Sequence, residues 1–120
     1  GKPRQIELSI GIKAYLVPMK LKKLSDDFLF WDKNRSFDVY EIASRLHHRA
    51  VQIHPFQNGN GRYSRMLANI YLRQKGLMPV KWQEDLLASE NPKRSEYIEA
   101  LKKADNRDYN DLIEMHKITY

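Results

Sequence analysis

Residues 54–65 read HPFQNGNGRYSR, and this short stretch decides how the rest of the chain is interpreted. On both sides of it, apolar residues recur every three or four positions, which is typical of amphipathic helices. Pro55 ends the first helix, because the residue before a proline is disfavoured in the helical region. The glycines and asparagines that follow are typical of a loop. The stretch therefore predicts a loop over residues 56–61, with His54 at the end of one helix and Arg62 near the start of the next.

This predicted loop has the features of an anion-binding site. Glycine and asparagine tolerate positive φ, so successive backbone N–H groups can turn toward one point. The following helix adds unpaired N–H donors and the positive end of its dipole. Arg62 and Arg65 are three residues apart, so they share a helix face and can each bind phosphate oxygens in pairs. With the imidazole of His54 as a base, the segment supplies the groups that phosphoryl transfer requires.

Plainer interpretations of the same residues stay open. Asn-Gly pairs are common in tight turns, so residues 58–61 could simply connect two helices. A histidine at a helix C-terminus can be a favourable cap charge, and two arginines on a helix face are usually solvated. The functional interpretation is favoured because all of these features fall within one short segment and in a workable order.

The remaining segments predict an all-α domain with one small strand element. Residues 6–17 alternate between apolar and polar positions, which is typical of a strand, and Pro18 ends it. His47 and His48 are adjacent and point about 100° apart on a helix, so they cannot bind one metal ion together and we expect structural roles. Helical spacing or capping residues predict further helices after Pro18, over residues 39–53, from Tyr63 to Gly76, from Asn91 and Pro92, and over residues 108–116. The helix from Tyr63 to Gly76 has a predicted core stripe of Tyr63, Met66, Leu67, Ile70 and Tyr71.

The composition sets broad limits on function. The 120 residues are the size of one domain, and 42% are hydrophobic, which predicts a globular chain. The chain has no cysteine, which excludes disulfides and thiolate metal sites and fits a reducing cytoplasm. No apolar run approaches the roughly 20 residues that cross a bilayer, and the N-terminus lacks the pattern of a signal peptide. We therefore expect a cytoplasmic protein with no membrane partner.

The charge balance favours anionic ligands. Lys and Arg number 21 against 15 Asp and Glu, a net charge of +6. Such an excess suits phosphates, nucleotides or nucleic acid, although it is more often a solubility feature. Because no nucleic-acid recognition motif is present, nucleic-acid binding is the less favoured of these interpretations.

Residues 54–65 closely resemble the Fic motif, HPFx(D/E)GNGRxxR, and match it at every fixed position except residue 58. The flanking residues 45–49 and 97–113 resemble the branch of that family named mobile mystery protein B. The resemblance covers roughly residues 5–113 and implies a single catalytic core over residues 1–120. The implied fold is an all-α Fic bundle with a β-hairpin flap near the N-terminus, here at residues 6–17.

The resemblance also implies an activity, the transfer of AMP from ATP to a Ser, Thr or Tyr hydroxyl of a target protein. His54 would be the general base and Phe56 would anchor the loop. The target would add to the flap as an extended strand. The implied ATP ligands are Asn58, Gly59, Asn60 and Gly61, the last three as an anion hole, with Arg62 and Arg65 on the outer phosphates. Alternatives on the same fold are another phosphoryl-type transfer and a catalytically weak module that binds a nucleotide or a partner.

Asn58 departs from the motif. The family usually has Asp or Glu there, and that acid helps to coordinate the Mg²⁺ that bridges the phosphates. An amide carbonyl is a weaker ligand for magnesium than a carboxylate, so we expect weaker metal binding or a slower reaction. Asn58 could still position a metal-bound water, or the phosphates could hold the metal themselves.

Many Fic relatives also carry an inhibitory helix whose glutamate pairs with the second arginine of the motif, here Arg65. The chain shows no clear version of it: Glu90-Asn91 has the right ending, but Leu86 stands where Ser or Thr is expected. We therefore expect Arg65 to be free for phosphate. The alternative is a separate antitoxin chain that supplies the glutamate.

Overall fold

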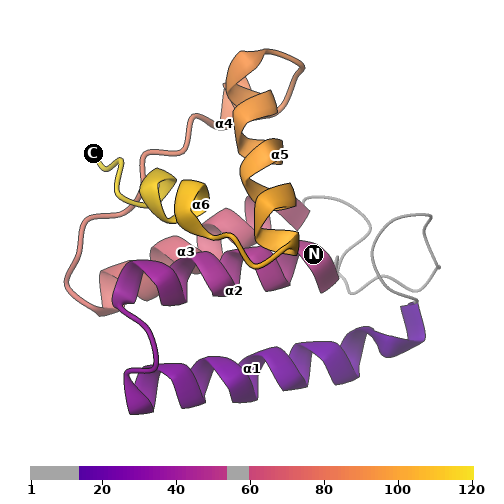
Figure 1. Ribbon diagram of the computed structural model, residues 1–120, viewed down its shortest axis with the longest axis vertical. Helices are drawn as coiled ribbons and strands as arrows, with labels where there is room; N and C mark the ends of the chain where they lie inside the picture. Colours follow the sequence, from indigo (N-terminus) through magenta and orange to yellow (C-terminus); the bar gives the residue numbers. More distant parts are fainter. Residues whose placement is uncertain (1–13, 54–59) are drawn as a thin grey trace.

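The computed structural model describes residues 14–53 and 60–120 of the chain, and these form a helical domain (Figure 1). The elements, in order, are η1 (Ala14–Leu16), α1 (Val17–Asn34), α2 (Val39–Ile53), α3 (Asn60–Gln74), α4 (Glu84–Leu87), α5 (Pro92–Asp105) and α6 (Asn110–Met115). In the described part of the chain, the only β-structure is an isolated antiparallel bridge between Val80 and Thr119.

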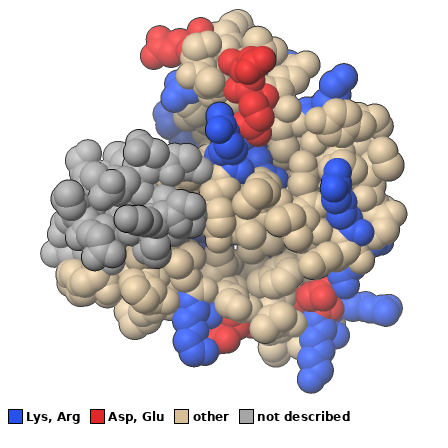
Figure 2. Space-filling model, turned by 180° about the vertical axis from the view of Figure 1, so that it is seen from behind, with Lys and Arg blue, Asp and Glu red and all other residues tan. Residues whose placement is uncertain are grey.

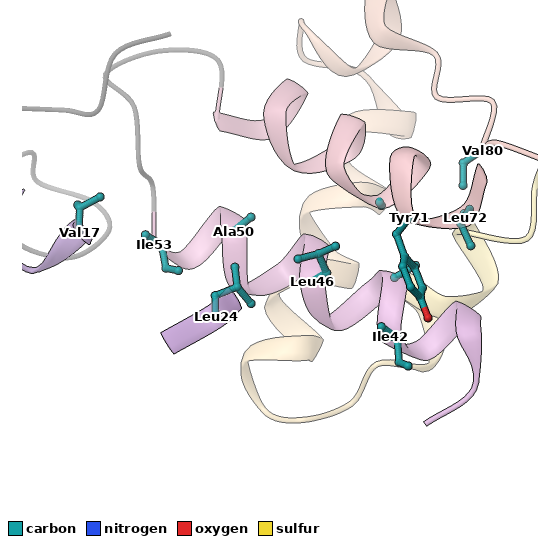
Figure 3. Packing of buried hydrophobic residues seen from close by; sticks show 11 residues of the cluster. Val17, Leu24, Ile42, Leu46, Ala50, Ile53, Tyr71, Leu72 and Val80 are labelled. Carbon is teal, nitrogen blue, oxygen red and sulfur yellow. The ribbon is translucent and has the colours of Figure 1, made fainter. Parts of the chain in front are cut away.

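Helix α2 lies at the centre and packs against α1, α3 and α6. Its buried positions recur at helical spacing, as the sequence predicts, and face the main core. In Figure 3, the side chains along α2 meet Tyr71 and Leu72 of α3. The buried apolar residues of α2 are Ile42, Ala43, Leu46, Ala50 and Ile53.

The predicted N-terminal strand is not seen. Most of its range, residues 6–13, lies outside the described residues. Its last residues are helical: Ala14–Leu16 form a 3₁₀ turn, and Val17 begins α1. Pro18 explains this outcome, because its fixed φ suits the first turn of a helix and it needs no hydrogen-bond partner there. The strand prediction is therefore wrong for residues 14–17.

The core face of α3 differs from its predicted apolar stripe. Met66 and Ile70 are exposed, whereas Ser64 and Ala68 are fully buried. Helix α3 packs against α2, and Ala68 belongs to the main hydrophobic core. The hydroxyl of Ser64 is satisfied inside the helix, because it donates to the carbonyl of Asn60 at 2.8 Å. Periodicity alone missed this face because its small and polar members do not look hydrophobic.

Helices α5 and α6 form a second, smaller core around Ala100, Ala104 and Leu112. The predicted cap of α5 is confirmed: the side chain of Asn91 accepts a hydrogen bond from the backbone N–H of Arg94 at 3.1 Å. Helix α4 was not predicted, since a single turn carries no periodic pattern.

Charged side chains are spread over the face shown in Figure 2, with uncharged surface between the basic groups. This is how a solvated surface usually carries excess charge. Among the residues that the structure describes, no helix is long and apolar enough to cross a membrane.

Candidate functional site

The predicted site residues fall into two groups. His54, Asn58 and Gly59 lie outside the described residues, as does Phe56. The other four lie at the N-terminus of α3. Asn60 and Gly61 belong to its first turn rather than to the preceding loop, Arg62 is exposed, and Arg65 is 8% exposed. The structure therefore places the second half of the motif on one helix end, as the sequence predicts.

Arg65 is held by Glu84, which lies at the start of α4. Its Nε donates to Oε2 of Glu84 at 2.8 Å, and its Nη2 donates to Oε1 at 2.5 Å. Two parallel bonds of this kind make the strongest arginine–carboxylate geometry. The expectation that Arg65 is free is therefore wrong: a glutamate of the same chain, 19 residues further along, occupies it.

Tyr97 of α5 provides a third bond to the same guanidinium. Nη1 of Arg65 donates to the Tyr97 hydroxyl at 3.2 Å, and the guanidinium carbon lies 5.3 Å from the centre of the Tyr97 ring. Burial alone would lower the pKa of Arg65, but the bonds to Glu84 and Tyr97 outweigh it and raise the pKa, so the side chain stays charged. Burial raises the pKa of Tyr97, so its hydroxyl keeps its proton.

Gly61 leaves room for this guanidinium. A Cβ atom at position 61 would lie 2.8 Å from Nη1 of Arg65, closer than such contacts normally come. An alanine there would push the guanidinium away from its partners on α4 and α5. The glycine of the motif thus has a packing role in addition to exposing the backbone at the helix start.

A cleft of about 560 Å³ opens at the N-terminus of α3. A 15-residue helix directs the positive end of its dipole there. Three arginines from α3 and α5 add positive charge, and apolar side chains from α4 and α5 line the rest. Such a cleft suits an anion that carries an apolar or aromatic group. Its described lining consists of Asn60, Gly61, Arg62, Arg65, Leu87, Arg94, Tyr97 and Ile98.

The described residues offer no site for a metal ion. Nowhere in residues 14–53 and 60–120 do three His, Asp or Glu side chains gather as metal ligands would. His47 and His48 point to different partners, as predicted. Nε2 of His48 lies 2.8 Å from Oδ1 of Asp105, and His47 lies in the buried interior.

The sequence matches a known family at this site. The profile of the Fic/DOC family matches residues 1–72, more than half of the chain. The chain belongs to the Fic/DOC family. The match includes α2 and most of α3, the helix whose N-terminus borders the cleft.

Several curated Fic/DOC relatives are protein adenylyltransferases. The chain is 30% identical over 116 residues to protein adenylyltransferase Fic of Drosophila grimshawi, covering 94% of the chain and 23% of the relative. It is 29% identical over 118 residues to the protein of the same name from Nematostella vectensis, covering 94% and 26%. A third, protein adenylyltransferase fic-1 of Caenorhabditis briggsae, is 34% identical over 83 residues, covering 67% and 16%. The chain thus spans about a quarter or less of the length of these relatives.

Solved structures show the same Fic/DOC fold. Fic-1 of C. elegans, residues 134–508, superposes with a TM-score of 0.71 at 26% identity, covering 94% of this chain and 32% of that one. A Fic domain containing signaling protein from Bacteroides thetaiotaomicron superposes with a TM-score of 0.76 at 22% identity, covering 95% and 47%. At that identity, the second likeness bears on the fold alone.

Sequence reasoning missed two residues of the Fic/DOC site. Glu84 sits in a single turn of helix and resembles any solvated acid, so its sequence environment carries no signal. For Tyr97 the sequence favoured core packing, which is observed, over a place beside the adenine pocket, and its bond to Arg65 was not predicted. The available signal was a tyrosine on the buried face of a helix rich in lysine and arginine, because the hydroxyl of a buried tyrosine usually has a hydrogen-bond partner.

Proposed function

We propose that this chain is the catalytic core of a protein adenylyltransferase, which transfers AMP from ATP to a hydroxyl of a target protein. Membership of the Fic/DOC family and the names of its relatives support this proposal. The observation that carries it is the cleft at the N-terminus of α3, whose described lining includes Asn60, Gly61, Arg62 and Arg65. The apolar lining from Leu87 and Ile98 suits a nucleoside base beside the phosphates.

The proposed step is an in-line displacement. A Ser, Thr or Tyr hydroxyl of the target attacks the α-phosphorus of ATP and loses its proton to His54. The bond from the α-phosphorus to the oxygen that bridges to the β-phosphorus breaks, and pyrophosphate leaves. Gly59, Asn60 and Gly61 stabilise the transferring phosphate through backbone N–H groups, and Arg62 and Arg65 neutralise the outer phosphates.

Mg²⁺ as a cofactor is a further proposal, and it rests on position 58 of the motif. The described lining of the cleft contains no carboxylate. Glu84 is bound to Arg65 rather than open to a metal. If Mg²⁺ takes part, Asn58 and the phosphates of ATP would hold it, and no step above depends on it.

Labelled ATP distinguishes the candidate functions. We expect label at the α-phosphate to appear on protein hydroxyls in a lysate, and label at the γ-phosphate not to appear. Transfer from the γ position alone would identify another phosphoryl-type transfer on the same fold. ATP binding without transfer of either label would identify a catalytically weak binding module.

The bond between Arg65 and Glu84 predicts that Glu84 restrains ATP binding. A phosphate that binds Arg65 must displace the carboxylate of Glu84. We expect Glu84→Gln to lower the dissociation constant for ATP by roughly threefold to tenfold, because the amide competes with phosphate less than a carboxylate does. Isothermal titration calorimetry measures this change.

Asp85→Asn is the matched control for this experiment. Asp85 is exposed and adjacent to Glu84 in α4, so its substitution removes the same charge without touching Arg65. We expect the affinity for ATP to stay within about twofold. Equal gains in both variants would mean that general charge, and not the Arg65 contact, sets the affinity.

Four finer assignments are part of the proposal. The chain belongs to the mobile mystery protein B branch on the likeness of residues 45–49 and 97–113. It acts in the cytoplasm, as the absence of cysteine suggests. Its target docks on residues 6–17, and its regulation resembles that of a toxin with an antitoxin partner that acts on Arg65.

A further inference from the structure

A buried line of hydrogen bonds runs inward from Arg65. The Tyr97 hydroxyl, which accepts from Nη1 of Arg65, lies 2.7 Å from Nε2 of His47. Nδ1 of His47 lies 3.1 Å from Nε2 of His116. Both imidazoles are fully buried. Four side chains from α2, α3, α5 and the end of α6 thus form one continuous line, which we name the Arg65 relay.

The inner end of the Arg65 relay fixes the position of its protons. Nδ1 of His116 lies 2.7 Å from the carbonyl oxygen of Leu112 and 3.1 Å from Oγ of Ser44. The carbonyl can only accept, so His116 carries its proton on Nδ1. Oγ of Ser44 donates to the carbonyl of Tyr40 at 2.8 Å, so toward His116 it also accepts.

The proton on Nδ1 of His116 determines the donor and the acceptor at every other hydrogen bond of the relay. If His116 is neutral and protonated on Nδ1, its Nε2 accepts, and His47 must donate from its own Nδ1. Nε2 of His47 then accepts, so the Tyr97 hydroxyl donates to it. The oxygen of Tyr97 is left with lone pairs directed at Arg65, whose guanidinium can only donate. The two ends of the relay therefore require the same direction of donation at each link.

The surroundings keep the relay neutral and in place. Burial lowers the pKa of His47 well below its usual value, with His116 and Arg65 adding to the effect. Burial also lowers the pKa of His116 to about 4. The ring of Trp82 packs edge-on against His47, Tyr97 and His116, with centroids 5.2–5.9 Å apart. Both imidazoles are therefore uncharged at neutral pH and sterically confined.

We propose that His47 and His116 are positioning residues. They direct the lone pairs of the Tyr97 oxygen toward Arg65 and so hold the guanidinium at the edge of the phosphate cleft. The catalytic consequence rests on the function proposed above, because the relay touches no substrate itself. The tautomers of the two histidines and the contact that holds Arg65 do not depend on that function. The sequence predicted only a structural role for His47. The relay connects that role to the candidate site through Tyr97 and Arg65.

Nuclear magnetic resonance of the whole chain tests the relay without any activity. Long-range ¹⁵N–¹H correlations at pH 7 distinguish the tautomers of each neutral imidazole. We expect both His47 and His116 to carry their proton on Nδ1. Either ring protonated on Nε2, or on both nitrogens, would overturn the proposal, because one link would then place two donors face to face.

Tyr97→Phe tests the hold on Arg65. This variant keeps the ring and removes only the hydroxyl, and Ser95→Ala removes an exposed hydroxyl from the same helix as a control. We expect the Nε–H signal of Arg65 to shift in Tyr97→Phe and to stay unchanged in Ser95→Ala. An unchanged Arg65 signal in folded Tyr97→Phe would overturn the proposal.

Kinetics then connect the relay to the proposed function. We expect Tyr97→Phe to raise the KM for ATP about fivefold with a smaller change in kcat, since one neutral bond to a phosphate-binding group is lost. His47→Gln, which keeps an acceptor for Tyr97, should lose less than His47→Leu. If even the unchanged protein transfers no AMP, the proposed function fails and the spectroscopic test of the relay still stands. If KM is equal in Tyr97→Phe and the unchanged protein, the relay does not act on the site.

Discussion

Substituting His54 by alanine is expected to lower AMP transfer by on the order of 10²–10⁴-fold while ATP still binds. The reason is chemical: a neutral hydroxyl attacks phosphorus poorly, and a positioned base contributes an acceleration of that size. In the proposed site the phosphate contacts come from Arg62, Arg65 and the start of α3, so the dissociation constant for ATP should change little. Single-turnover transfer from α-labelled ATP, together with calorimetry of ATP binding, measures the two effects separately.

Gln52→Ala is the matched control for the His54 variant. Gln52 is exposed in the last turn of α2, two residues before His54, and its amide lies 3.4 Å from Oδ1 of Asp105. We expect its transfer rate to stay close to that of the unchanged chain. Undiminished transfer in His54→Ala would refute the assigned base, and loss of ATP binding in that variant would point to a role in the cleft instead.

The sequence was sufficient for the helical fold because most of its helices carry one continuous apolar stripe. The range of α2 and the cap of α5 were predicted correctly, since spacing and capping chemistry are local properties. The stripe of α3 was predicted less well. Its buried face includes Ser64 and Arg65, whose burial depends on partners elsewhere in the chain. The strand over residues 6–17 was wrong at its end because Pro18 favours a helix start over a strand end.

Only part of the candidate site could be predicted from the sequence. The motif brought Asn60, Gly61, Arg62 and Arg65 to one helix end, which is a local arrangement. The bond from Arg65 to Glu84 depends on the path of residues 75–83, and no local pattern encodes that path. The same holds for the relay, whose histidines are 69 residues apart and meet only after α6 packs against α2. Long-range polar contacts of this kind have to be seen in three dimensions.

The buried imidazoles predict a loss of stability in mild acid. In the unfolded chain a histidine binds its proton near pH 6.5, whereas in the folded chain the pKa of His116 is about 4. Between these values the unfolded state binds more protons, so the free energy of unfolding falls as the pH falls. His116 alone should remove about 3 kcal/mol by pH 4. His47, whose pKa burial also lowers, changes stability in the same direction.

Urea unfolding at pH 7, 6, 5 and 4 measures this dependence, and His116→Asn is the variant that isolates it. The variant need not match the stability of the unchanged chain at pH 7, because the slope with pH is the quantity compared. We expect that slope to be shallower in His116→Asn between pH 4 and 6.5. Asp32 contributes mainly below this range: the bond from Lys75 lowers its pKa below 3.8, so most of its contribution is lost at lower pH. An equal slope in both proteins would mean that folding does not lower the pKa of His116, so burial would not be what keeps the inner end of the Arg65 relay neutral.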